Sequence, residues 1–174
     1  MIGNQNFGSK VEFSFNGRAA IRIDTGATVQ VVMSNSEDTL RISSSDANGV
    51  DTGTCFLIGE HNYMIVDRPR TEGDYRLYPL KRYWLTGAVY RRIDRDRDSF
   101  GRVTNMVPEL VYPSIPVMVQ SPASANKSLF TSKVYDLKQA DEIRLEDETF
   151  RVNAITVLAC GLHRLDVTRQ QPTP

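Results

Sequence analysis

Short apolar stretches that alternate with polar residues, and that end at turn residues, run along most of the chain. A period of two is typical of a half-buried β-strand, because successive side chains of a strand point to opposite faces. In the first half this pattern predicts strands at 11–15, 18–23, 28–33, 39–42, 55–58, 63–66 and 75–80. Only 134–139 favours a short helix. We therefore expect an all-β fold, either a sandwich or a small barrel.

Turn residues and two long polar segments separate the predicted strands. Asn16 and Gly17 form a dipeptide typical of a tight hairpin, because both residues tolerate a positive φ. The polar segment 34–54, broken at most by the short strand at 39–42, is predicted to be a long loop, and so is 120–134. Further turns are predicted at 59–62 and 69–74.

A weak internal repeat relates the two halves of the chain. The segment 56–66 matches 143–153 at an offset of 87 residues, with Tyr63 and Phe150 in the same place after an acidic turn. Further matches relate 75–77 to 163–165 and 14–18 to 99–102. Half of the 174 residues is 87, so the pattern predicts two tandem small β-barrel or sandwich units with long loops, residues 1–87 and 88–174. The alternative to a duplication is that the two halves contain unrelated β-hairpins that happen to follow in a similar order.

The charges balance, since 21 Lys and Arg face 21 Asp and Glu. No long-range field therefore draws the chain to nucleic acid or to anionic lipid, and low net charge favours a subunit of an assembly over a concentrated free protein. The sequence has neither a secretory signal pattern nor an apolar run of about 18 residues. We expect folding and assembly in a cytosol, without a membrane.

Two Asp-Thr-Gly strings, at Asp24 and Asp51, are the most conspicuous chemical motif. They resemble the signature of aspartic proteases, in which two such loops face each other and their carboxylates share one proton. A two-lobed protease places a whole lobe between its aspartates, whereas 27 positions separate Asp24 from Asp51. Asp and Gly are also common in turns. We interpret both aspartates as turn residues, with a protease that uses Asp24 as the weaker alternative.

Other catalytic groups are sparse. His61 lies in a predicted turn and His163 in a predicted strand, and neither has a nucleophile in a suitable context. Cys55 and Cys160 are far apart in the sequence, so we expect two buried, reduced thiols and neither a zinc site nor a disulfide framework. We predict no catalytic, cofactor-binding or metal-binding residues, and a protein that is not an enzyme.

A charged run at 91–98 alternates Arg with Asp and so carries almost no net charge. Its arginines, Arg91, Arg92, Arg95 and Arg97, are candidate subunit contacts. The alternatives are a solvated hairpin arm laced by ion pairs and, less favoured, a non-specific contact with DNA phosphates.

The second half contains two strings that form a recognisable hairpin pattern. Val89-Tyr-Arg-Arg, followed by Asp98-Ser-Phe-Gly-Arg-Val, is similar to the opening hairpin of the family of phage head-to-tail joining proteins. The segments 141–145, 149–152 and 164–167 are similar to its closing strands, and 56–66 with the polar turn 67–74 is similar to the same closing hairpin in the first half. The family normally has one such unit per chain, and Ala140 stands where it usually has Gly.

This resemblance implies a structural protein of the virion, a head-tail connector or head-closure stopper in the neck of a bacteriophage. Such a protein forms an oligomeric, closed ring with itself, contacts the portal or adaptor protein and the tail proteins, and touches packaged DNA non-specifically. The segments 34–54 and 120–134 would then be lumen-plug or inter-ring loops. The alternative is another tandem β-barrel virion or binding module, such as a baseplate, tail or decoration protein.

Overall fold

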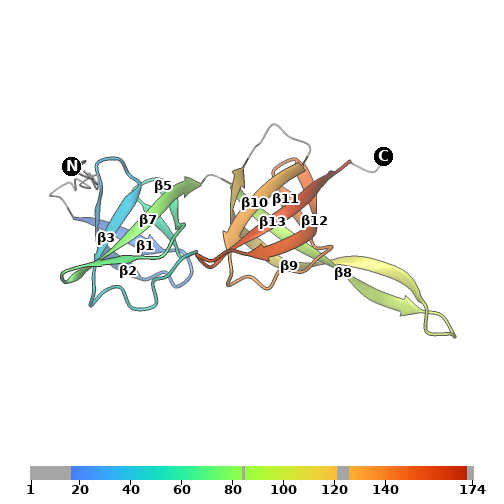
Figure 1. The fold of residues 1–174 in the computed structure, drawn as a ribbon. Coiled ribbons are helices and arrows are strands. Elements are labelled where there is room, and N and C mark those ends of the chain that lie inside the picture. Colours follow the sequence, from blue (N-terminus) through green and yellow to red (C-terminus); the bar gives the residue numbers. More distant parts are fainter. Residues whose placement is uncertain (1–16, 84, 121–125, 172–174) are drawn as a thin grey trace, which may run out of the picture.

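The chain folds into two small β-barrels that lie side by side, with a long hairpin projecting from the second (Figure 1). The computed structural model describes residues 17–83, 85–120 and 126–171, and within these ranges it contains strands and turns but no helix. The first barrel comprises β1 (Arg18–Arg22), β2 (Thr28–Met33), β3 (Thr39–Ser43), β4 (Cys55–Ile58), β5 (His61–Ile65), β6 (Arg70–Glu72) and β7 (Tyr75–Tyr83). The second comprises β8 (Leu85–Arg97), β9 (Val103–Gln120), β10 (Asn126–Ser132), β11 (Glu142–Leu145), β12 (Glu148–Val157) and β13 (Leu162–Gln170).

Both sheets close on themselves, so almost every strand edge is paired. The first sheet runs β3-β2-β1-β4-β5-β7, and the pairing of β3 with β7 closes it, while β6 extends β7 on the outside. The second sheet is a closed barrel in the order β10-β13-β12-β11-β8-β9. Closure removes the open edges that promote aggregation. The predicted all-β fold with two tandem small barrels is confirmed.

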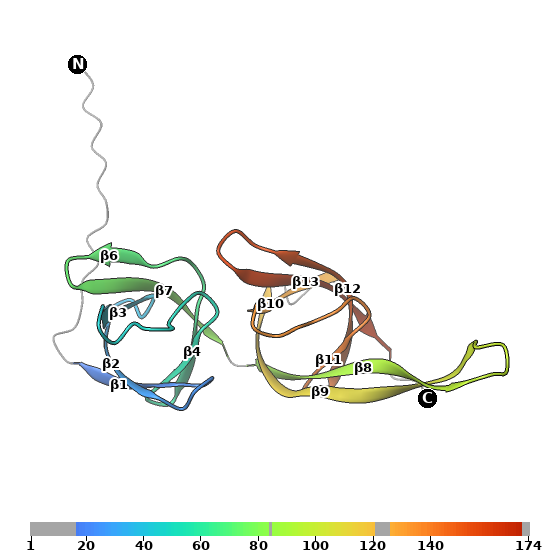
Figure 2. The ribbon, with the colours of Figure 1, turned by 90° about the horizontal axis from the view of Figure 1, so that it is seen from below.

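The two barrels have the same strand order and the same antiparallel pairings, with β4, β5 and β7 in the places of β11, β12 and β13. In the first barrel Phe56 lies opposite Tyr63. In the second, Ile143 lies opposite Phe150. Since both pairs are related by the same shift of 87 residues, the register of this hairpin is preserved between the copies. Seen from below, the matching rings lie next to each other (Figure 2).

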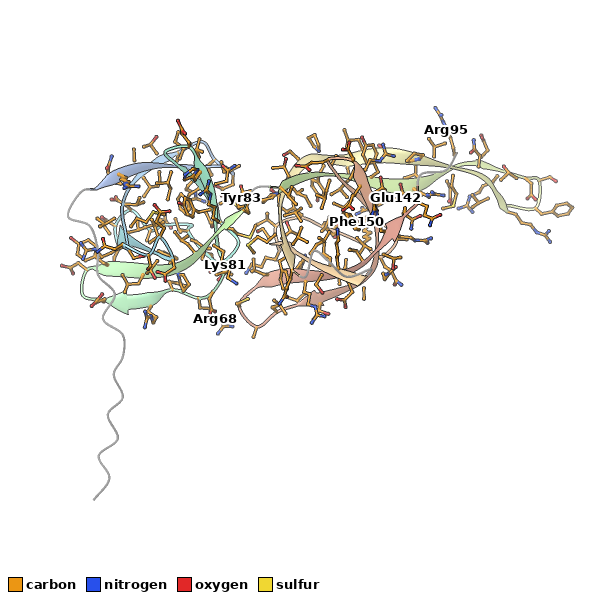
Figure 3. The ribbon with its side chains drawn as sticks, turned by 90° about the horizontal axis from the view of Figure 1, so that it is seen from above. Arg68, Lys81, Tyr83, Arg95, Glu142 and Phe150 are labelled. Carbon is orange, nitrogen blue, oxygen red and sulfur yellow. The ribbon has the colours of Figure 1, made fainter. Side chains whose placement is uncertain are left out.

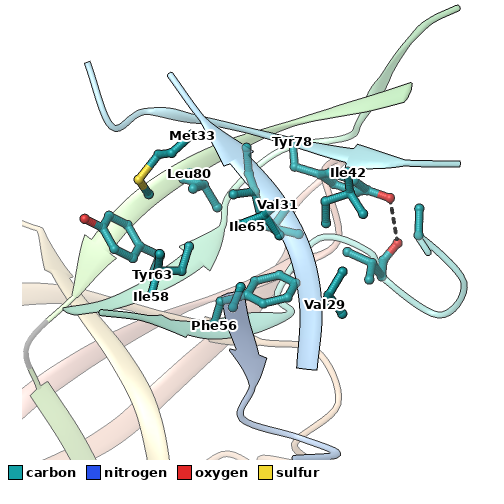
Figure 4. Close-up of a cluster of buried hydrophobic side chains, with 14 residues drawn as sticks. Val29, Val31, Met33, Ile42, Phe56, Ile58, Tyr63, Ile65, Tyr78 and Leu80 are labelled. Carbon is teal, nitrogen blue, oxygen red and sulfur yellow. Dashed lines mark hydrogen bonds between the residues drawn. The ribbon is translucent and has the colours of Figure 1, made fainter. Parts of the chain in front are cut away.

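Each barrel has its own apolar core, built from the inward-facing positions of its strands. In the first, Phe56, Tyr63 and Ile65 pack beneath β2, and the Tyr78 hydroxyl donates a hydrogen bond to the Val50 carbonyl at 3.5 Å (Figure 4). The second core has an aliphatic or aromatic residue at most equivalent positions: Val89, Ile115, Val117, Leu129, Leu137, Ile143, Leu145, Phe150, Val152, Leu165 and Val167. Each core therefore supplies its own hydrophobic stabilisation.

Several sequence-based expectations about single segments are wrong. The predicted helix at 134–139 is a turn-rich loop, because Leu137 is buried in the core and so short a segment does not pay the cost of helix nucleation. Part of the predicted turn 69–74 is strand β6, and seven residues of the predicted loop 120–134 form strand β10. In both cases pairing with a neighbouring strand, invisible in the local pattern, decides the structure.

The start of the chain also differs from expectation. Gly17 does not have a positive φ, unlike seven other glycines among the described residues. Arg18 opens β1, whereas Arg102 lies in the turn between β8 and β9, so the predicted match of 14–18 with 99–102 is wrong where it can be compared. The predicted strand 11–15 lies outside the described residues. Strand β8 begins at Leu85 and belongs to the second barrel, slightly before the expected boundary at 87/88.

In the described part of the chain, no helix is long and apolar enough to cross a membrane.

Candidate functional site

Strands β8 and β9 continue far beyond the wall of the second barrel and form a two-stranded arm. Strand β8 pairs with β11 only as far as Tyr90. From Arg91 onward it pairs with β9 alone, so we define the arm as residues 91–110. The equivalent hairpin of the first barrel turns immediately after Arg22. At about 3.4 Å per residue, the arm reaches roughly 20 Å past the barrel, pointing away from the first barrel (Figure 1).

The base of the arm is fixed by two ion pairs with the barrel. Arg91 donates through Nε and Nη2 to the two carboxylate oxygens of Asp141, both at 2.8 Å, and also to the Asp136 carbonyl. Asp141 is almost fully buried, and this bond raises the pKa of the Arg91 guanidinium above its ordinary value. Arg92 pairs with Glu142 at 2.9 Å. Bidentate pairing of a planar guanidinium sets direction as well as energy, so the arm leaves the barrel at a defined angle.

The tip of the arm is a hydrogen-bonded turn. The Asp98 carboxylate accepts hydrogen bonds from the backbone N–H groups of Phe100 and Arg102, at 2.9 and 2.8 Å. Gly101 has φ +78°, a value that glycine adopts without strain. This turn holds the Phe100 side chain outward, with 85% of its surface exposed.

The arm exposes much of its apolar surface. Half of the ten large hydrophobic side chains found exposed in the described ranges lie on it: Ile93, Phe100, Val103, Met106 and Leu110. A hairpin of two strands is marginal in water without a packed face, and clustered exposed apolar side chains mark interaction surfaces. The arm therefore has the composition of a docking element.

The four arginines predicted as subunit contacts divide into two pairs. Arg91 and Arg92 lie at the base, held by the barrel carboxylates of Asp141 and Glu142. Arg97 and Arg95 lie further out. Arg97 pairs with Asp94 at 2.7 Å, and Arg95, labelled in Figure 3, forms no ion pair with any residue of the described ranges. Neither arginine of the outer pair is thus bound to a barrel carboxylate.

A second feature is the contact between the barrels. Cys55, Met64 and Tyr83 of the first barrel form a buried cluster with Leu162 of the second. Arg68 donates to the Ala159 carbonyl at 2.8 Å. Gly53 faces Ser132 so closely that a Cβ atom on Gly53 would lie 2.5 Å from the serine oxygen. The two barrels are therefore packed against each other.

An apolar groove opens beside this contact. Its volume is about 550 Å³ and both barrels line it, through Val66, Val117, Met118, Phe130, Leu158 and Cys160 among others. Lys81, Arg82 and Asp67 also line it. Figure 3 shows Lys81, Tyr83 and Arg68 where the barrels meet. A groove of this size and polarity can hold one or two large apolar side chains.

The residues of the Asp-Thr-Gly strings lie in turns, as predicted. Asp24 forms a bidentate pair with Arg22, which lowers the pKa of the Asp24 carboxyl. Asp51 accepts from the backbone N–H of Thr52 and lies 3.6 Å from Lys133. Each carboxylate thus has a cationic partner of its own, Arg22 for Asp24 and Lys133 for Asp51, whereas the carboxylates of a proton-sharing pair face each other.

The other candidate groups are held in ordinary environments. His61 is the first residue of β5 rather than a turn residue, and its Nδ1 lies 2.8 Å from Arg82. His163 lies in β13, as predicted. Cys55 is buried, which raises the pKa of its thiol to about 12, whereas Cys160 is only half-buried and lies in the turn before β13. The expected burial of both thiols is therefore wrong for Cys160.

Among the described residues no cluster of His, Cys, Asp and Glu has the geometry to hold a metal ion. Comparisons with family models, with curated proteins and with solved structures find no match to this chain.

Sequence reasoning found the arm but did not single out Phe100, its most exposed large hydrophobic side chain. Phe100 entered only as part of a motif, although an aromatic within a turn of Asp, Ser and Gly is expected to be exposed. The groove had no sequence signal, because Val66, Met118 and Leu158 come from distant segments of both halves.

Proposed function

We propose that this protein is a structural subunit of a phage neck, a head-tail connector or stopper that assembles into a closed ring between portal and tail. The observation that carries the proposal is the rigidly based arm with its exposed apolar surface, on a body of two closed barrels. Closed barrels supply a stable body without open strand edges. An arm that buries its apolar residues only on meeting a neighbour supplies the force for assembly.

The sequence supports the assignment to a phage neck in particular. The arm leaves the barrel within the string Val89-Tyr-Arg-Arg and turns at Asp98-Ser-Phe-Gly, the two strings that resemble the opening hairpin of head-to-tail joining proteins. The arm is also the main departure from symmetry between the copies. One copy therefore has a contact element that the other lacks, as expected of a subunit between two different neighbours.

Assembly is tested by sedimentation velocity and negative-stain imaging of the purified protein. We expect closed rings with a central hole. The matched control is a shortened arm in which residues 94–106 are replaced by Asn-Gly, a two-residue hairpin turn that joins the paired residues Ile93 and Val107. This variant keeps Arg91 and Arg92 with their ion pairs, and it should fold but stay monomeric.

The outcomes separate the candidate functions. A wild-type chain that stays monomeric up to its solubility limit contradicts the ring. An assembly without a central hole favours the alternative, another tandem β-barrel virion or binding module. Peptidase activity abolished by Asp24→Ala would instead favour the protease.

A further inference from the structure

Resting on the proposed ring assembly, we infer that the arm tip of one copy docks in the inter-barrel groove of the next copy, with Phe100 as the inserted side chain. The arm tip has an exposed apolar side chain, and the groove is an apolar hollow that can receive one. The tip presents one large, almost fully exposed aromatic on an ordered turn. The groove presents apolar side chains of both barrels around a volume of about 550 Å³.

Geometry requires that the two come from different copies. The arm leaves the second barrel on the side away from the first barrel, whereas the groove lies where the barrels meet (Figures 1 and 3). The Arg91–Asp141 pair fixes the arm at its base and opposes folding back. A contact between two different surfaces of identical chains is head-to-tail, and repetition of such a contact closes a ring when the rotation allows.

Charged side chains border both features. Lys81, Arg82 and Asp67 line the groove, so basic side chains outnumber acidic ones there. The tip carries Asp96 and Asp98 together with Arg95 and Arg102. The basic side chains of the groove can therefore meet the acidic side chains of the tip in a polar rim around the apolar centre.

A native cysteine makes the contact directly testable. Cys160 lines the groove and is half-buried. Cys55 is buried and its pKa is raised to about 12, so its thiol stays protonated and is a poor reactant in disulfide formation. We would introduce Ser99→Cys, at the exposed tip position next to Phe100, so that the aromatic anchor is kept, and oxidise with copper phenanthroline. The expected product is a ladder of disulfide-linked multimers on non-reducing gels, with peptide mapping joining position 99 of one chain to Cys160 of another.

Two controls limit the interpretation. Ser99→Cys combined with Cys160→Ser should give no ladder, and persistent linking would indicate contact between two tips and overturn the inference. Tyr75→Cys places a thiol at another exposed position outside the arm and the groove, and should give only background linking.

A reversible measurement supplements the cross-link. Phe100→Ala should weaken self-association by at least about tenfold, as expected for a central aromatic anchor, whereas Val134→Ala, an exposed apolar position elsewhere, should not. Wild-type rings that are insensitive to Phe100→Ala, together with no link to Cys160, overturn the docking but leave ring assembly standing. A wild-type monomer that gives no cross-link overturns both.

Discussion

Tyr63 and Phe150 occupy the same position in the two barrels. Each lies on the second strand of a hairpin, opposite a fully buried residue of the first strand, and each is itself 2% or less exposed. They differ at one point, because the Tyr63 hydroxyl donates a 2.9 Å hydrogen bond to Glu37 at the barrel surface. At Phe150 the polar neighbour is instead the Lys127 ammonium, which lies 5.1 Å from the ring centroid. The two copies therefore share the packing of this site and differ in the polar group beside it.

Phe150 and Phe100 offer the same substitution in two opposite environments. Phe150→Ala removes a fully buried ring and should lower the free energy of unfolding by about 3–5 kcal/mol. Phe100→Ala, at a side chain that is 85% exposed, should change it by less than about 0.5 kcal/mol. Urea denaturation under monomeric conditions measures both. A large loss in Phe100→Ala would mean that the arm tip packs against its own chain.

The ion pair at the base of the arm should matter more than the pair further out. Arg91→Met leaves the buried Asp141 carboxylate without its cation and should cost about 2–3 kcal/mol. Arg97→Met breaks an exposed pair with Asp94 and should cost at most about 1 kcal/mol. Equal losses on thermal and urea denaturation would contradict the role of Arg91 as the anchor of the arm.

Gly53 should be irreplaceable for two reasons, of which Gly26 shares only one. Both glycines have a positive φ, which costs a side chain about 1–2 kcal/mol. Only at Gly53 does an added Cβ meet Ser132 of the other barrel, at 2.5 Å from its oxygen. Gly53→Ala should therefore be more destabilising than Gly26→Ala, and Ser132→Gly should recover part of the difference. No recovery would place the cause within the first barrel.

His163 should make the stability depend on pH. Burial lowers the pKa of its imidazole below the ordinary value of 6.5, and its Nδ1 has no hydrogen-bond partner among the described residues. The unfolded chain therefore binds this proton more readily than the folded chain, so the contribution is present above about pH 6.5 and is lost as the pH falls below it. Urea denaturation at about pH 7.5 and about pH 5.5 measures the free energy of unfolding at each pH. Between these two values the free energy of unfolding should fall less for His163→Gln than for the wild type.

The outer arginines should contribute to assembly through charge. Arg95→Glu with Arg97→Glu leaves the ion pairs at the base intact, so the monomer should stay folded. Self-association should weaken, and added salt should weaken that of the wild type in the same direction, because exposed pairs are screened. Normal assembly of the double variant at ordinary salt, measured by sedimentation velocity, would show that the outer charges face solvent and make no subunit contact.

Local pattern was enough to predict the strands whose own faces are buried. The alternation in 28–33 and the apolar run 55–58 match β2 and β4 at both ends, because β2 packs one face in the core whereas β4 has buried side chains on both faces. The repeat at an offset of 87 was also visible, since buried aromatic and aliphatic positions change little when a barrel is kept. The sequence by itself thus determined an all-β chain of two similar units with a charged hairpin in the second.

Tertiary pairing decided the rest. Strands β6 and β10 form because β7 and β13 offer free backbone groups at the right place, although their own residues predict turns and loops. Leu137 becomes a core residue because its loop folds over the end of the barrel, which excludes the predicted helix. The groove and the direction of the arm depend on how two closed barrels pack and on the Arg91–Asp141 pair, whose members lie 50 positions apart in the sequence. Contacts over such distances leave no periodicity in the chain.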